Sequence, residues 1–171
     1  MNIIEYTLLI FIIICLLTMI FIAIYNNFQI SLIRIDEAEH NIKNVLTERF
    51  NLLDKAREII SSNTDEEKPL EACEKLRSKK LDDVELDKEL LPIINEFYTY
   101  EGKYPNLKTN EQYMSINFSL DGTESELEAF KKYYNDIITD YNKMVKTFPT
   151  NIVAGCSKYK KKPYFEAKKE S

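Results

Sequence analysis

The most constraining feature of the sequence is an uninterrupted apolar run near its start, residues 7–25, which carries no charged side chain. Its 19 residues match the roughly 20 that an α-helix needs to cross the hydrocarbon core of a membrane. A cleaved signal peptide is the alternative, and it requires basic residues before the run and a small-residue cleavage site after it. The only charged side chain before the run is Glu5, and the run ends in YNNFQ, which contains no such site. We therefore predict an uncleaved, single-pass transmembrane anchor over residues 1–25.

Basic residues on the two sides of the run predict its orientation. No Lys or Arg precedes it, whereas Arg34 and Lys43 follow it. Because positively charged flanks stay in the cytoplasm, we expect the N-terminus outside the cell and the soluble part of the chain in the cytoplasm. Asp36 and Glu37 reduce the local positive charge and weaken this signal.

The residues after the run predict that the anchor helix continues without a break. No Pro or Gly occurs between Tyr25 and Ile60. Apolar residues in this range recur at alternating spacings of three and four, as in a helix that packs one stripe against its neighbours. They are Phe28, Ile35, Ala38, Ile42, Val45, Leu52, Ala56 and Ile59. Ser31 and Arg49 occupy the two gaps in this stripe.

A polar stretch at residues 61–69 predicts a turn before a second helical region, which covers roughly residues 65–101. Pro92 lies inside that region, and an interior proline removes a backbone hydrogen bond and kinks a helix. The stretch SKKLDD, residues 78–83, is another weak point. We therefore expect the second region to be bent or split.

The third region has the most regular pattern, since eleven positions follow an unbroken alternation of three and four. They are Tyr113, Ile116, Leu120, Thr123, Leu127, Phe130, Tyr134, Ile137, Tyr141, Met144 and Phe148. Gly122 is a poor helix residue, and Thr123 and Glu126 match a capping box, so a break there is the alternative. A loop would shift the phase of the pattern, and the phase does not shift. We predict one long helix through Gly122 that ends at Phe148-Pro149.

These regions predict an all-α fold: the transmembrane helix continues into an antiparallel bundle of three long helices, or four if the second is split, over residues 26–149. If the first helix leaves the membrane and the second returns, the elbow between the second and third helices lies beside the membrane. The candidate elbow residues are Gly102, Tyr104, Pro105 and Leu107. Glycine and proline stop helices, and the two apolar side chains would pack on the end of the bundle.

Residues 150–171 form a basic C-terminal segment with six lysines and two glutamates, whereas residues 26–149 hold 17 basic and 25 acidic side chains. The candidate interaction residues in this tail are Lys160, Lys161, Lys162, Tyr164 and Phe165. Contact with anionic lipid or nucleic acid is conceivable, but the expected bundle places the tail at the far end from the membrane. A solvated tail, or one docked on an acidic partner or on its own bundle, is the favoured interpretation. A net charge of −5 argues against a broad nucleic-acid interface.

No pattern in the sequence predicts catalysis, a cofactor or a metal. Glu37 and His40 share one helical face, but a bundle di-metal site uses that pair twice, and His40 is the only histidine. Three widely spaced cysteines fit neither a disulfide scaffold nor a thiolate metal site. The acidic run at residues 82–89 is typical of a solvated helix face, and the tyrosines of the third region stand at core positions. We therefore expect a protein that is not an enzyme.

Several segments in a fixed order resemble the LemA family of bacterial membrane-anchored proteins. They are YNNF at 25–28, ERFNLL at 48–53, YPNLKTNEQY at 104–113, GTESEL at 122–127, YYNDIITDYNKMVKTFPTNIVAG at 133–155 and KKPYFEA at 161–167. The resemblance implies an anchored helical bundle in which GTESEL lies within a helix. No enzymatic activity or cofactor is established for that family, so the resemblance supplies no catalytic residues. The chain departs from the family where Glu48-Arg49, Asp54-Lys55 and Glu39 replace the usual Arg-Arg, Pro-Asn and Trp.

Two functions remain open. The favoured hypothesis is a non-enzymatic, membrane-tethered bundle that binds protein partners in envelope signalling or membrane organisation and does not bind nucleic acid. The alternative is a ligand-handling or catalytic protein whose site the sequence hides. A solid apolar core would favour the first hypothesis, and a buried polar cluster at one end of the bundle would favour the second.

Overall fold

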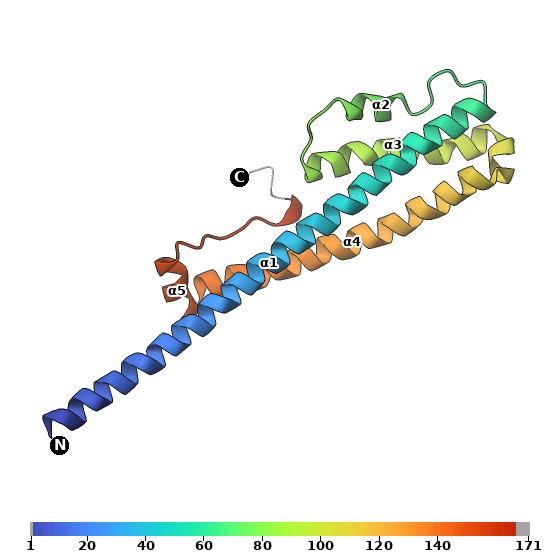
Figure 1. The fold of residues 1–171 in the computed structure, drawn as a ribbon. Helices are drawn as coiled ribbons and strands as arrows, with labels where there is room; N and C mark the ends of the chain where they lie inside the picture. The colour runs from blue at the N-terminus through green and yellow to red at the C-terminus, as the bar shows by residue number, and fades with distance from the viewer. Residues whose placement is uncertain (1, 167–171) are drawn as a thin grey trace. The chain divides into compact units, whose positions relative to one another are not determined.

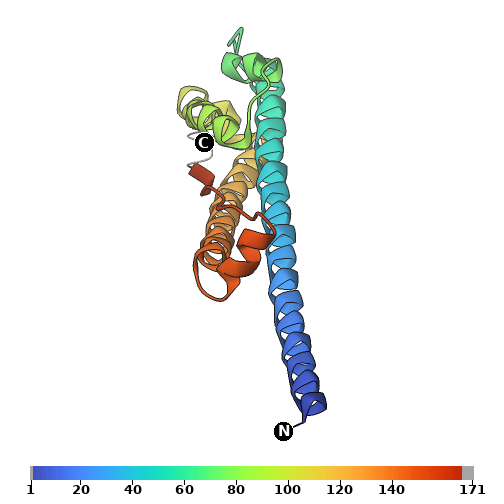
Figure 2. The same ribbon diagram turned by 90° about the vertical axis from the view of Figure 1, so that its left-hand side faces the viewer.

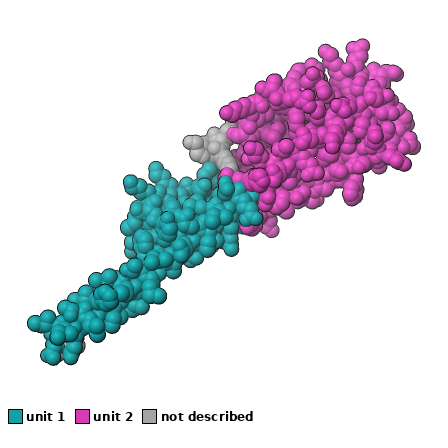
Figure 3. Space-filling model, in the orientation of Figure 1, with its two compact units in different colours: residues 1–37, 134–164 teal, residues 38–133, 165–171 magenta. Residues whose placement is uncertain are grey.

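The computed structural model describes residues 2–166, which form helices and connecting segments with no strand among them. In chain order the elements are α1 (Ile3–Asn63), α2 (Glu71–Arg77), α3 (Asp83–Lys103), the 3-10 helix η1 (Pro105–Thr109), α4 (Glu111–Lys146) and α5 (Thr150–Cys156) (Figure 1). The all-α prediction is therefore confirmed. The chain divides into two compact units, and α1 and α4 contribute to both (Figure 3). Unit 1 contains residues 1–37 and 134–164, and unit 2 contains residues 38–133 and 165–171.

The apolar run and the helix that follows it form one continuous element, as the absence of helix breakers predicted. α1 extends from Ile3 to Asn63 without interruption. Every residue from Ile3 to Ala23 is exposed, and Figure 3 shows this stretch projecting bare from the remainder of unit 1. A helix of this length and apolarity is sufficient to cross a membrane.

The remainder of unit 1 packs the C-terminal half of α4, α5 and the following residues against α1. Figures 1 and 2 both show α5 beside α1. The core contains Phe28 and Tyr141, whose rings meet edge-to-face at 5.8 Å. An edge-to-face pair places the positive ring edge against a negative ring face, which favours this geometry.

Unit 2 contains the remaining halves of α1 and α4 with α2 and α3. α2 runs antiparallel to α1, because Arg77 pairs with Asp54 at 2.5 Å while the earlier Glu74 pairs with the later Arg57 at 2.9 Å. α3 runs in the same direction as α1. Asp87, near the start of α3, lies 3.9 Å from Arg49, whereas residues just beyond the end of α3 contact the end of α1.

The second region is split, which was one of the predicted alternatives, but only its first part returns along α1, and its second part follows the direction of α1. The break falls between α2 and α3, at the weak point around residues 78–83. Asp82 fixes the new start, since its side chain accepts a hydrogen bond from the Glu85 backbone at 2.8 Å and Glu85 reciprocates in a capping box. Pro92 lies inside α3 without splitting it.

α4 runs unbroken through Gly122, as the phase of its pattern predicted. Its stripe is buried at Tyr113, Leu127 and Tyr141. Thr123 is also buried, and its hydroxyl donates to the Leu120 carbonyl at 2.7 Å, so the polar group is satisfied inside the helix. The pattern was wrong at its end, because α4 stops at Lys146.

Candidate functional site

The predicted elbow residues lie in the turn between α3 and α4, but not beside the apolar run. The Asn106 side-chain amide donates to the backbone carbonyl of Asn63, the last residue of α1, at 2.6 Å. The Tyr104 hydroxyl donates to Glu66 at 3.2 Å. The expected position beside the membrane is therefore wrong, because α3 follows the direction of α1 and carries the elbow to the C-terminal end of that helix.

Within the elbow, proline and the apolar residues have the predicted positions and glycine does not. Pro105 begins η1, and Leu107 is fully buried. Gly102 lies inside the last turn of α3 with no positive φ, so it does not terminate the helix. Asn110 caps α4, since its side-chain oxygen accepts from the Tyr113 backbone at 2.9 Å.

The basic tail is docked on α4 as far as the structure describes it, which agrees with one of the predicted alternatives. The Asn142 amide donates to the Lys162 carbonyl and accepts from the Lys162 backbone, both at 2.9 Å. The Tyr134 hydroxyl donates to the Pro163 carbonyl at 3.1 Å. In unit 2, Phe165 is buried, and the Lys131 ammonium lies 5.6 Å from the centre of its ring. Residues 167–171 lie outside the described part of the chain.

The tail begins beside the apolar run, although it was expected at the far end from the membrane. The Tyr159 ring lies 4.8 Å from Phe28 and 6.3 Å from Tyr25, the last residue of the run. Its hydroxyl accepts a hydrogen bond from the Gln29 amide at 2.6 Å. These contacts fix the start of the tail on the first turns of α1 after the apolar run.

Lysines are concentrated in the part of the chain that contains Tyr159. Between Asp140 and Glu166 the sequence holds six lysines and no acidic residue. The pKa of Lys161 is lowered because its neutral amino group can accept a hydrogen bond from the Lys146 ammonium, and because the charge of Lys146 repels its protonated form. Lys146 and Lys161 are therefore a close pair of basic side chains in unit 1.

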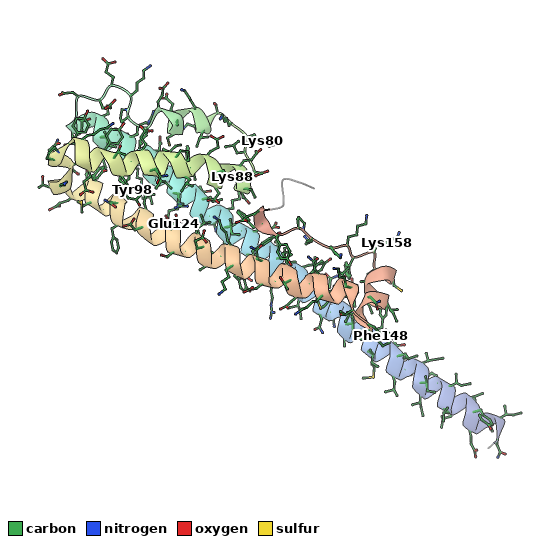
Figure 4. The ribbon with its side chains drawn as sticks, turned by 180° about the vertical axis from the view of Figure 1, so that it is seen from behind. Lys80, Lys88, Tyr98, Glu124, Phe148 and Lys158 are labelled. Carbon is green, nitrogen blue, oxygen red and sulfur yellow. The ribbon has the colours of Figure 1, made fainter. Side chains whose placement is uncertain are left out.

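A second polar cluster lies inside unit 2 and is centred on Arg49. Its side chain is 4% exposed, and its guanidinium pairs with Asp87 on α3 at 3.9 Å and with Glu124 on α4. Lys131 binds the other side of Asp87 at 2.7 Å. Figure 4 shows Glu124 and, from α3, Tyr98 on neighbouring helices. The cluster thus links α1, α3 and α4.

The electrostatics of this cluster follow from its burial. Desolvation lowers the pKa of Arg49, while the charge of Asp87 opposes that effect. Burial, with a 2.6 Å hydrogen bond to Asp121, raises the pKa of Tyr98 to about 12. Among the described residues, the Arg49 Nε is a buried side-chain nitrogen with no hydrogen-bond partner.

Sequence reasoning missed this cluster, although one signal was visible. Arg49 fills a gap in the apolar stripe of α1, and a charged residue in a buried stripe requires a partner. Glu37 and His40, the spacing weighed as a metal pair, are both exposed. Among residues 2–166, no three His, Cys, Asp or Glu side chains are arranged to hold a metal ion.

The sequence comparison decides the family. The model of the LemA family matches residues 38–171, which is most of the chain. The protein belongs to the LemA family. A comparison with curated proteins finds no match.

The segments that resembled LemA proteins now have positions in the fold. YPNLKTNEQY forms the elbow and the start of α4, and FPTNIVAG forms the turn after α4 and most of α5. In α5, Val153 and Ala154 are buried, whereas Ile152 is exposed. Phe148 is 80% exposed.

Unit 2 of this LemA protein also has an open groove between α1 and α4, with a volume of about 620 Å³. Leu52, Ile59 and Ile116 supply its apolar part, and Lys55 and Ser115 are among the polar residues around them. Neither this groove nor the hollows lined by Arg57, Tyr104 and Leu86 is lined by Arg49. The groove and the Arg49 cluster are therefore separate features.

Proposed function

We propose that this LemA protein is a non-enzymatic, single-pass protein of the bacterial cell membrane whose cytoplasmic helical bundle binds protein partners. The groove between α1 and α4 carries the proposal. An apolar floor surrounded by polar side chains has the composition of a protein-binding surface, in which apolar contacts give affinity and the polar rim gives orientation. The exposed apolar stretch of α1 tethers the bundle that carries this surface to the membrane.

The Arg49 cluster supports a structural interpretation more than a chemical one. A catalytic arginine needs access to a substrate, and this side chain is enclosed and turned towards two carboxylates of its own bundle. The unpaired Nε nevertheless favours the alternative, a ligand-handling protein, because a buried donor without a partner is energetically unfavourable. Native mass spectrometry of the detergent-extracted chain tests that alternative: a retained small molecule that is lost in Arg49→Lys would establish it.

Partner binding is tested by cross-linking in intact cells, followed by purification and identification of the attached proteins. Ser115→Arg places a long charged side chain in the groove, and Ser125→Arg makes the same change at an exposed site elsewhere on α4. We expect a set of proteins that is recovered with the wild type and with Ser125→Arg and is lost with Ser115→Arg. Equal recovery from all three would refute the groove as the binding surface.

Orientation is tested separately by adding protease to spheroplasts. If the soluble part is cytoplasmic, the protease leaves it intact until the membrane is permeabilised. Cleavage in sealed spheroplasts would reverse the proposed orientation.

A further inference from the structure

We propose that the lysine segment, residues 143–162, rests on the anionic surface of the bilayer that α1 enters. The inference rests on the proposed membrane insertion of α1 and is independent of the groove in unit 2. It was not expected from the sequence, because the predicted bundle placed the tail away from the membrane. All the contacts that carry it lie within unit 1.

Position is the first argument. Tyr159 packs on Tyr25, the last residue of the apolar run, and hydrogen-bonds Gln29, about one helical turn later. When residues 7–25 span the hydrocarbon core, Tyr25 and Tyr159 lie at the level of the headgroups. Tyrosine is enriched at this depth because its ring is apolar and its hydroxyl is polar.

Charge is the second argument. The lysine segment contains Lys143, Lys146, Lys158, Lys160, Lys161 and Lys162 and no acidic residue. Lys158, Lys160 and Lys161 are exposed. The nearest acidic residues of α1 after the run, Asp36 and Glu37, lie about two turns beyond Gln29. A segment with six positive charges at the edge of an anionic leaflet is attracted to it.

Exposed apolar side chains are the third argument. Phe148 is 80% exposed and Ile152 is 56% exposed, while Val153 and Ala154 face the interior of the unit. Figure 4 places Phe148 where the bare stretch of α1 begins, and Lys158 lies on the same part of the chain. Aromatic and apolar residues next to lysines are the composition of surfaces that dip into the headgroup region.

The experiment uses the full chain in lipid nanodiscs and a reporter that the sequence makes available. The chain has no tryptophan, so Phe148→Trp introduces a single one into the lysine segment. Phe118→Trp is the matched control, because Phe118 on α4 in unit 2 is equally exposed, at 82%. With anionic lipid, we expect the emission of Phe148→Trp to shift to shorter wavelength and to be quenched by brominated lipid, with no change for Phe118→Trp.

The lysines are tested in the same background. Replacing Lys158, Lys160 and Lys161 with Gln should weaken contact by about fivefold per lysine, and so by about a hundredfold. Replacing three exposed lysines of unit 2 with Gln is the matched control and should have no effect. These are Lys80, Lys88 and Lys108, the first two of which are labelled in Figure 4.

High salt should also weaken the contact, because it screens surface charge. Incorporation of the chain into nanodiscs reports on anchoring by itself, so failure of the anchor and failure of the lysine segment are distinguishable. If the chain inserts but Phe148→Trp shows no quenching by brominated anionic lipid, the proposal is wrong. The same holds if the unit 2 control lowers the signal as much as the replacement of Lys158, Lys160 and Lys161.

Discussion

Removing one member of the Arg49 cluster at a time should destabilise the protein by an amount that depends on whether a buried charge is left without its partner. Arg49 and Asp87 are 3.9 Å apart, and their side chains are 4% and 20% exposed. At this distance the Coulomb attraction is about 4 kcal/mol for an effective dielectric constant near 20, before desolvation is subtracted. Asp87→Asn leaves the enclosed guanidinium with Glu124 alone, and we expect a loss of about 3 kcal/mol in the free energy of unfolding.

Arg49→Met should lower the free energy of unfolding less than Asp87→Asn does, although it removes the most buried charge of the cluster. Asp87 keeps Lys131 at 2.7 Å, and the Glu124 side chain is 53% exposed and remains hydrated. Methionine retains the apolar contacts of the arginine stem, and its burial carries no charge desolvation. We expect a loss of about 1 kcal/mol, and less than about 1 kcal/mol for Glu124→Gln, which alters a half-exposed pair.

The double variant sharpens the test. Once Asp87 is Asn, the charge of Arg49 is unfavourable, so adding Arg49→Met should recover part of the loss caused by Asp87→Asn. The assay is urea unfolding of the full chain in mild detergent, followed by far-ultraviolet circular dichroism. If Arg49→Met were as damaging as Asp87→Asn, or the double variant less stable than both single variants, the charge of Arg49 would not be unfavourable once Asp87 is removed, and the reasoning above would be refuted.

Three other variants test local features. Gly122→Ala should raise the free energy of unfolding by up to about 1 kcal/mol, because an added Cβ meets nothing within 4 Å in the middle of α4; a loss would contradict a helical Gly122. Leu107→Ala should lower stability by about 2–5 kcal/mol as a cavity forms in the elbow, and Tyr104→Ala should lower the melting temperature less; an unchanged melting temperature for both would argue against a structural elbow. Burial raises the pKa of the Cys73 thiol to about 11, so at pH 8 a water-soluble maleimide should label exposed Cys156 and leave Cys73 unmodified until urea is added; mass spectrometry of the labelled peptides decides.

The two long helices could be predicted from the sequence because their evidence is local and repeated. A stripe that keeps its phase over many turns determines the helix, and Gly122 could not outweigh it. The buried face was predicted less exactly, since Leu53 and Ile60 are in the core where Leu52 and Ile59 were expected. The start of α3 was also encoded locally, in the capping box of Asp82 and Glu85. This start was not located from the sequence, because Pro92 and residues 78–83 both offered a place for the break. Pro92 removes one backbone hydrogen bond from α3, but the helix continues through it.

The Arg49 cluster could not be predicted for a different reason. The stripe shows that Arg49 is buried, but its partners come from two other helices. Which carboxylates meet it depends on the register and direction of α3 and α4, and these are set by tertiary contacts rather than by periodicity. Several acidic residues on each helix were equally good candidates by sequence, so the pairing with Asp87 and Glu124 becomes visible only in the fold.

The break between α2 and α3 explains why the elbow and the tail were both predicted at the wrong end of α1. With an unsplit second region, the chain would pass along α1 once before the elbow, and the elbow would lie beside the apolar run. The break at residues 78–82 makes α2 the return and α3 a further outward pass, so the elbow reaches Asn63 and α4 runs back until Tyr141 meets Phe28. The start of the tail therefore lies on the first turns of α1 after the apolar run and not at the far end of that helix. The number of passes thus places Tyr159 beside Tyr25, and this contact is the structural basis of the proposed contact between the lysine segment and lipid.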